Sequence, residues 1–223
     1  FKMQKNISLV IGSSGLVGSY ILKNLEGTDE KVIILSRKPN LKKDYSTEEI
    51  ITDFTNLNIL PSADTLYVAI GYKLSIFDLM FIPYKKRQEF MKVDFSTVLK
   101  VARLAFANGT KQILVVSAVG ANPNSMNLYL KTKGELEEEI KKIGYESITF
   151  ARPSHLLGKR LNQPNAKLIE FIEFFSKLVQ PLMISGLKKF RNIEAKKVAA
   201  TMVKSSKNLN SIQILEYKDF VKN

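Results

Sequence analysis

The sequence has no cysteine and a single histidine, His155, among its 223 residues. Without thiols the chain can form neither disulfides nor thiolate metal sites, and it has no cysteine nucleophile. A lone imidazole excludes catalysis that needs two, and it leaves little with which to bind a transition metal. We therefore expect no metal ion, and we look for the chemistry among hydroxyl, phenol and ammonium groups.

Long hydrophobic runs are also missing. No segment is long and uncharged enough to span a bilayer, and the N-terminal residues show neither a signal peptide nor a transit segment. No internal repeat, low-complexity tract or linker interrupts the chain. These features predict a single domain over residues 1–223, located in the cytoplasm.

Acidic residues are scarce relative to basic ones. The chain has 21 Asp and Glu against 34 Lys and Arg, a formal net charge of +13, which raises the hypothesis of nucleic-acid binding. However, the lysines are scattered, and short clusters such as Lys85-Lys86-Arg87 are not interleaved with aromatic residues. We therefore expect no specific nucleic-acid partner, although the charge favours anionic ligands and acidic surfaces.

Apolar runs of four to six residues alternate with longer helical patterns, which is typical of β-α-β units and a parallel sheet. The predicted strands cover 7–11, 31–35, 50–53, 65–70, 111–117, 146–151 and 211–217, and the predicted helices 15–25, 85–108, 125–143, 166–179 and 193–204. Strands this apolar need helices on both faces of the sheet. The predicted fold class is α/β, a doubly wound parallel sheet. Residues 1–155 form its core, and 156–223 a small substrate-covering portion with the last strand.

A glycine-rich turn joins the first strand to the first helix. Glycines at this point allow a tight turn, a close backbone approach to a pyrophosphate and close packing of helix on strand. The phosphates then lie at the positive end of the helix. The turn predicts a dinucleotide site made by Gly12, Ser13, Ser14, Gly15, Leu16, Val17 and Gly18.

The choice of cofactor depends on the end of the second strand, where a carboxylate would hold the ribose of NAD. This strand ends in Ser36-Arg37-Lys38, without an acid. A guanidinium and an ammonium there can pair with the 2′-phosphate of NADP(H), so we expect NADP(H) in preference to NAD(H). The alternative is that both are ordinary loop cations in a lysine-rich chain.

Other cofactor contacts are expected from residues that follow later strands. Asp53 and Phe54 follow the third strand and are expected to face the adenine. Ala69, Ile70 and Gly71 follow the fourth and are expected beside the adenosine ribose, and Pro153 follows the sixth. His155 lies two residues further on, where it either approaches the nicotinamide or has a structural role.

Tyr129 and Lys133 lie four residues apart and so share one face of the predicted helix over 125–143. A phenol with a pKa of about 10 exchanges protons poorly at neutral pH, and a nearby ammonium lowers that pKa. Tyr129 can then exchange a proton with a carbonyl or alcohol oxygen, while Lys133 also holds the nicotinamide ribose. Ser117, twelve residues before Tyr129, ends the fifth strand and can orient the substrate oxygen. We take these three as the catalytic residues.

These motifs resemble the Tat-interacting-protein family of atypical short-chain dehydrogenase/reductases, most clearly over residues 116–121, 127–137 and 151–153. The resemblance implies a Rossmann fold, bound NADPH and the set Ser117, Tyr129 and Lys133. Animal members of the family are described as regulatory proteins, and its substrate class is not well defined. The chain departs from the family after Gly71, where residues 72–84 are longer and more apolar than expected.

Two apolar segments, 74–83 and 168–179, are candidates for shaping specificity. The first is expected to be a loop over the nicotinamide side of the pocket or a dimer contact. For the second we favour ordinary core packing, with the lining of an apolar substrate cavity or contact with a membrane surface as alternatives; core packing is also the alternative for the first. The favoured function is an NADP(H)-dependent oxidoreductase for a small carbonyl or alcohol, and the apolar segments make an apolar compound a candidate substrate. The alternative is a non-catalytic NADP(H)-binding regulator, and a sugar-nucleotide epimerase fits the short C-terminal portion less well.

Overall fold

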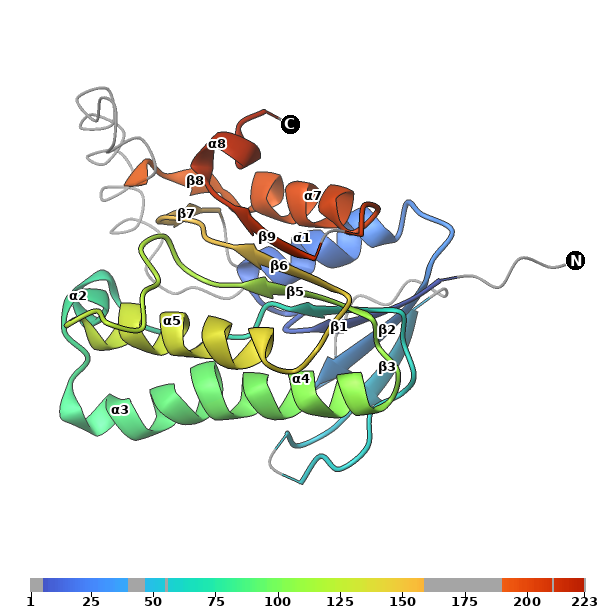
Figure 1. Ribbon diagram of the computed structural model, residues 1–223, viewed down its shortest axis with the longest axis horizontal. Coiled ribbons are helices and arrows are strands. Elements are labelled where there is room, and N and C mark those ends of the chain that lie inside the picture. Colours follow the sequence, from blue (N-terminus) through green and yellow to red (C-terminus); the bar gives the residue numbers. More distant parts are fainter. Residues whose placement is uncertain (1–5, 40–46, 55, 159–189, 210, 223) are drawn as a thin grey trace, which may run out of the picture.

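The computed structural model describes residues 6–39, 47–54, 56–158, 190–209 and 211–222. Seven strands form one sheet in the order β3-β2-β1-β4-β5-β6-β9 (Figure 1), and every neighbouring pair is parallel. The chain moves outward from β1 in one direction and returns to continue from β4 in the other. The predicted doubly wound α/β fold is therefore confirmed, with the switch point between β1 and β4.

The strands of the sheet are β1 (Ile7–Ile11), β2 (Lys31–Ser36), β3 (Thr47–Ile51), β4 (Thr65–Val68), β5 (Gln112–Val116), β6 (Ser147–Ala151) and β9 (Ile212–Leu215), and a small second sheet pairs β7 (Leu156–Leu157) with β8 (Ile193–Glu194). The helices are α1 (Leu16–Leu25), α2 (Ile76–Met80), α3 (Tyr84–Met91), the π-helix η1 (Lys92–Thr97), α4 (Val98–Ala107), α5 (Leu128–Lys141), α7 (Ala195–Ser205) and α8 (Tyr217–Phe220).

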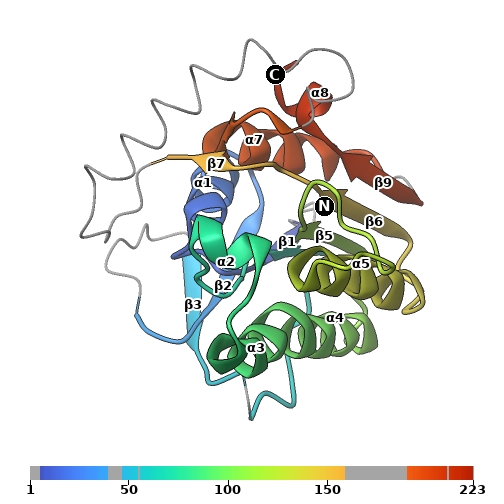
Figure 2. The same cartoon turned by 90° about the vertical axis from the view of Figure 1, so that its left-hand side faces the viewer.

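The helices cover both faces of the sheet, as Figures 1 and 2 show. Because successive side chains of a strand point to opposite faces, Leu9 and Ile11 of β1 join the core under α4 and α5, whereas Val10 joins the core under α1 and α7. Both cores are fully apolar at these positions. The uninterrupted apolar runs of the central strands thus follow from burial on two sides.

Several predicted elements differ from the observed ones. The third strand lies at Thr47–Ile51 rather than 50–53. Since β3 is an edge strand of the sheet, it accommodates polar residues such as Glu48, which the apolar pattern of a strand buried on both faces would exclude. Residues 74–83, expected as a loop, contain the short helix α2, which begins at a capping box made by Ser75 and Asp78. The predicted helix over 85–108 is present but includes the π-helical segment η1.

The C-terminal residues that the structure describes are built into the same sheet. Strand β9 pairs with β6, and α7 packs against α1. The predicted helix over 166–179, and with it the apolar segment 168–179, lies outside the described residues. Of the helices in the described ranges, none has the length and apolar character that crossing a bilayer requires.

Candidate functional site

The turn between β1 and α1 has room only for glycine at two positions. Gly12 has a φ of +89°, and a Cβ there would lie 2.5 Å from the carbonyl oxygen of Ala69; a Cβ on Gly18 would lie 2.0 Å from the carbonyl oxygen of Gly12. The turn is closed by a hydrogen bond of 2.9 Å from the Gly15 N–H to the Gly12 carbonyl. No side chain caps the start of α1, so its first N–H groups remain able to bind an anion.

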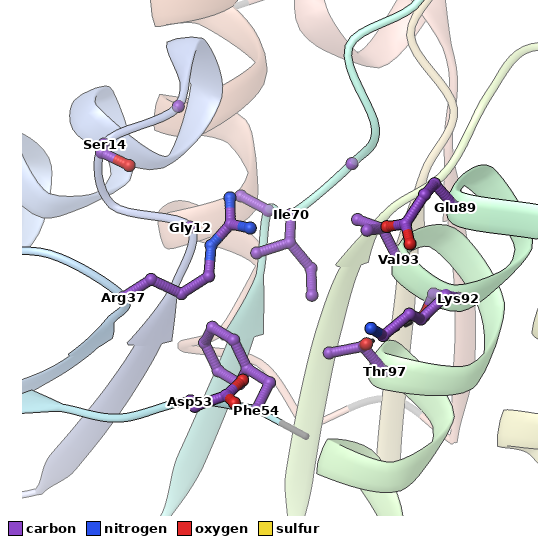
Figure 3. A pocket seen from close by; sticks show the side chains of 13 residues that line it. Gly12, Ser14, Arg37, Asp53, Phe54, Ile70, Glu89, Lys92, Val93 and Thr97 are labelled. Atoms are coloured by element: carbon purple, nitrogen blue, oxygen red, sulfur yellow. Dashed lines mark hydrogen bonds between the residues drawn. The ribbon is translucent and has the colours of Figure 1, made fainter. Parts of the chain in front are cut away.

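A pocket with an empty volume of about 780 Å³, open solvent included, begins at this turn. Figure 3 shows Arg37 extending into it from the end of β2, with Asp53 and Phe54 beside it. The opposite wall comes from α3 and η1. The lining residues are Gly12, Ser14, Gly15, Arg37, Asp53, Phe54, Ala69, Ile70, Gly71, Glu89, Lys92, Val93 and Thr97.

Nine of the residues predicted to bind the cofactor thus line one pocket. Sequence reasoning missed the wall formed by Glu89, Lys92, Val93 and Thr97, although their spacing of three, four and eight residues places them on one face of a helix. The other candidates do not line the pocket. Val17 and Gly18 are buried in α1, and Ser13 is buried with no hydrogen-bond partner for its Oγ in the described part of the chain.

The end of β2 has a carboxylate nearby that the sequence of β2 alone does not reveal. The Oγ of Ser36 lies 2.8 Å from Oε1 of Glu49 on β3 and 2.9 Å from the carbonyl oxygen of Lys38. Lys38 itself is exposed. Both partners are acceptors, so the single proton of Ser36 is shared between holding the turn after β2 and binding Glu49.

Tyr129 and Lys133 lie together at the start of α5. Asn127 caps this helix by accepting a hydrogen bond of 3.0 Å from the Leu130 N–H, which puts Tyr129 in the first turn. The Nζ of Lys133 is 6.0 Å from the centre of the Tyr129 ring. The centres of the Phe90 and Tyr129 rings are also 6.0 Å apart. The pair predicted from spacing therefore does share one surface of the helix.

A buried carboxylate, Asp94 of η1, completes this cluster. Its Oδ1 lies 2.7 Å from the Nζ of Lys133, and its Oδ2 accepts a hydrogen bond of 2.5 Å from the Tyr72 N–H. Both charged side chains are almost fully buried. Because Tyr72 follows the pocket residue Gly71, Asp94 ties Lys133 to the loop after β4. A π-helical turn often occurs at a functional site.

The charges in this cluster oppose one another. Burial raises the pKa of Tyr129; the ammonium of Lys133 lowers it, and the carboxylate of Asp94 raises it further. Burial, the largest single effect, lowers the pKa of Lys133, but Asp94, Tyr129 and Glu137 together raise it by more, so that the net shift is upward. At neutral pH the site therefore holds a neutral phenol beside an ammonium–carboxylate pair.

Ser117 lies in a different hydrogen-bond network. Its Oγ donates to Oε1 of Glu137 at 2.5 Å, and Arg152 binds the same carboxylate through Nε at 3.0 Å and Nη2 at 2.5 Å. Ser117 is buried, and within the described residues no hydrogen bond joins it to Tyr129. Pro153 accepts a hydrogen bond of 2.9 Å from the Val119 N–H and so supports the loop after β5.

The parallel sheet, the glycine turn and the Tyr129–Lys133 pair define a nucleotide-binding protein of the short-chain dehydrogenase/reductase class. The chain belongs to the NAD dependent epimerase/dehydratase family, whose model matches residues 8–204. It is 31% identical to the protein FMP52, mitochondrial, of Candida albicans over 69% of this chain and 68% of that one. It is 30% identical to the protein HTATIP2 of Rattus norvegicus over 72% of this chain and 66% of that one. The predicted resemblance to atypical members of the class is thereby confirmed.

Two solved structures have this fold but share little sequence with the chain. The structure of MoeE5 in complex with UDP-glucose and NAD matches with a TM-score of 0.71 at 15% identity, covering 97% of this chain and 80% of that one. An aldohexose dehydrogenase from Thermoplasma acidophilum, in ligand-free form, matches with a TM-score of 0.67 at 15% identity, covering 95% and 92%. At this identity the likeness concerns the fold alone.

Proposed function

We propose that the protein is an NADP(H)-dependent oxidoreductase that interconverts a small carbonyl and its alcohol. The observation that carries the proposal is the Tyr129–Lys133 pair, held at the same edge of the sheet as the glycine turn. The turn fits a dinucleotide, because a Cβ at Gly12 or Gly18 would overlap backbone atoms and the start of α1 has no side-chain cap. We take residues 1–155 as the cofactor-binding core and 156–223 as the C-terminal portion of one domain.

In the direction of reduction, the phenol of Tyr129 gives its proton to the substrate oxygen, so that the C=O bond becomes C–O–H. A reduced nicotinamide, when bound at the glycine turn, would supply the hydride to the substrate carbon. The ammonium of Lys133 stabilises the phenolate that remains, and Asp94 keeps this ammonium charged and in position. In the reverse direction the phenolate takes the proton of the alcohol.

The proposed role of Ser117 depends on its hydrogen bond to Glu137. While its hydroxyl donates to this carboxylate, it has no proton to offer a carbonyl oxygen. To orient a carbonyl, the hydroxyl must turn away from Glu137. The same turn is needed in the reverse direction, because the single proton of the alcohol is the one that Tyr129 takes and is not available to Ser117.

A preference for NADP(H) over NAD(H) is supported by Arg37, which extends into the pocket from the end of β2, and by the exposed Lys38 beside it. Glu49 opposes it, because a carboxylate at the end of β2 could serve an unphosphorylated ribose. We favour NADP(H) because the hydroxyl of Ser36 already engages Glu49, whereas the guanidinium faces the pocket.

The alternative function is that of a non-catalytic NADP(H)-binding regulator. It is favoured by two observations: Asp94 offsets the effect of Lys133 on the pKa of Tyr129, and Ser117 bonds to Glu137 rather than to Tyr129. A regulator of this kind would bind the cofactor and change its partners or shape without turnover.

Tyr129→Phe separates the two functions. We expect the variant to bind NADPH as the wild type does and to lose at least about 100-fold in the rate of NADPH consumption with a panel of small aldehydes and ketones, the usual contribution of a general acid. The control is Tyr20→Phe, a half-buried phenol on α1 that packs on the opposite face of the sheet from α5, which should leave the rate unchanged. Equal rates for wild type and Tyr129→Phe would contradict the enzymatic proposal and favour the regulator.

We keep the cytoplasm as the proposed location, although the fungal relatives carry "mitochondrial" in their names. Fractionation of cells that express the chain with a C-terminal tag tests it: recovery with mitochondria would contradict the cytoplasmic proposal.

A further inference from the structure

Five large apolar side chains are exposed where α2 meets the start of α5. Their exposed fractions are 82% for Phe77, 76% for Met80, 69% for Phe81, 85% for Tyr84 and 105% for Met126. We call these five residues the α2 patch. Figure 2 shows α2 facing the viewer, away from the cores on either side of the sheet. Single exposed apolar residues are common in proteins, but a cluster of this kind marks an interaction surface.

The backbone of this region is held by polar contacts. Ser75 and Asp78 form a capping box, and Lys86 lies 2.7 Å from Asp78. The side-chain amide of Asn127 donates to the carbonyl oxygens of Leu79 and Met80 at 2.8 and 2.9 Å. The charged Asp78 is buried while its apolar neighbours point outward, the reverse of an ordinary surface helix. The exposure of the patch is therefore a fixed feature of the fold.

Three cations lie next to the α2 patch along the chain. Lys73 and Lys85 are exposed at its two ends, and the guanidinium of Arg87 lies 5.3 Å from the centre of the Phe81 ring. Asp78, the acid on α2 beside the patch, is already paired with Lys86. A contact between two copies through this face would bring the same lysines together at its rim, in a chain that carries a net charge of +13. Charge therefore favours an anionic partner over a second copy.

We propose that the α2 patch docks the protein on the surface of an anionic lipid bilayer. Phe, Tyr and Met side chains enter the boundary between headgroups and acyl chains, and lysines at the rim pair with anionic headgroups. Asn127 lies two residues before Tyr129 on the chain, so docking turns the start of α5 toward the lipid. If the proposed reductase function holds, its substrate class is then an apolar carbonyl or alcohol dissolved in the membrane.

Co-sedimentation of the full chain with large vesicles tests the docking. Vesicles of phosphatidylcholine alone are compared with vesicles that contain about 30% phosphatidylserine, at about 0.1 M NaCl. We expect at least about tenfold stronger partitioning onto the anionic vesicles. Phe77→Ser/Phe81→Ser should reduce it at least tenfold. Ile59→Ser, which removes a side chain that is 80% exposed in another loop, should leave it unchanged. Lys73→Glu/Lys85→Glu should remove the preference for phosphatidylserine.

Three results would overturn the docking. They are no association with anionic vesicles, equal association of wild type and Phe77→Ser/Phe81→Ser, and a dimer in sedimentation velocity that this double variant dissociates. Each variant is also titrated with NADPH. If the wild type binds NADPH but not the anionic vesicles, the docking inference alone is refuted. If it binds the vesicles but not NADPH, the proposed function alone is refuted.

Discussion

At the scale of single residues, Asp94 controls the charge of the proposed catalytic cluster. It faces the ammonium of Lys133 at 2.7 Å and a backbone N–H of the pocket loop at 2.5 Å. The negative charge of Asp94 therefore cancels part of the effect by which Lys133 lowers the pKa of Tyr129. Tyr129 and Lys133 could be predicted from their spacing on a helix. The pairing with Asp94 could not, because it depends on how η1 packs against α5.

Replacing Asp94 by Asn tests this control. The amide keeps the size of the side chain but removes the negative charge that raises the pKa of Tyr129. We expect the phenol of Tyr129 to ionise at lower pH than in the wild type. The measurement is tyrosinate absorbance during a pH titration, taken as the difference between each protein and its Tyr129→Phe counterpart. An unchanged difference curve would show that Asp94 has no influence on the phenol.

The same variant should be less stable. Removing one partner of a buried ion pair leaves Lys133 uncompensated and typically costs about 3 kcal/mol in the free energy of unfolding. Since the pKa of Lys133 is raised in the folded protein, the stability that it contributes is fully present below its unfolded pKa of about 10.4 and is lost as the pH rises through the folded value. Urea denaturation of wild type and Asp94→Asn measures the difference in their free energies of unfolding. We expect this difference to be smaller at high pH than at pH 7, and an equal difference at the two pH values would contradict the prediction.

At the scale of elements, the central strands and α1 could be predicted because burial on both faces and a glycine turn leave strong patterns. The edge strand β3 was harder, since its partly exposed faces tolerate Thr47 and Glu48. Helix α2 escaped prediction because five residues are too few for a period. The π-helical turn η1 could not be predicted either, because the sequence pattern of its residues is that of an ordinary α-helix.

The junction of β1 and α1 predicts a sharp difference between two glycines. Gly18→Ala would place a Cβ 2.0 Å from the Gly12 carbonyl oxygen, whereas Gly27→Ala would place one 3.9 Å from the Asn24 carbonyl oxygen. We expect Gly18→Ala to lower the free energy of unfolding by about 2 kcal/mol or more, as overpacking does, and to abolish NADPH binding. Gly27→Ala should change neither. Urea denaturation measures the stability of the two variants, and nucleotide titration measures their NADPH binding. Equal results for both variants would contradict the close approach of α1 to the glycine turn.

Helix α2 predicts a protease-resistant segment in spite of its exposed aromatic residues. The Lys86 ammonium, the Ser75 backbone and the Ser75 hydroxyl lower the pKa of Asp78 to about 2. The capping contact is thus present above the unfolded pKa of about 3.9 and is lost only as the pH falls toward 2. At pH 7, Asp78→Ala should be cleaved by chymotrypsin between 77 and 84 several-fold faster than the wild type or Asp29→Ala. Equal rates would mean that the capping box does not hold α2.

At the scale of the whole molecule, the sheet brings the glycine turn, the end of β2 and the start of α5 to the same edge, although they are far apart in the sequence (Figure 1). Fold class and the pocket residues from the strand ends were predictable, because ligands of such sheets bind at this edge. The wall from α3 and η1 and the carboxylate of Glu49 were not, because each reaches the site from a neighbouring element.

The measurement that tests the account most directly is titration of the chain with NADPH and NADH, following nucleotide fluorescence. We expect NADPH to bind at least about tenfold more tightly than NADH, and Arg37→Ala to remove this preference, since a charge-assisted hydrogen bond is typically worth about 1.5 kcal/mol or more. Lys23→Ala, which removes an exposed cation from the last turn of α1, is the control and should retain the preference for NADPH. Binding of neither nucleotide would contradict the central claim of a dinucleotide site.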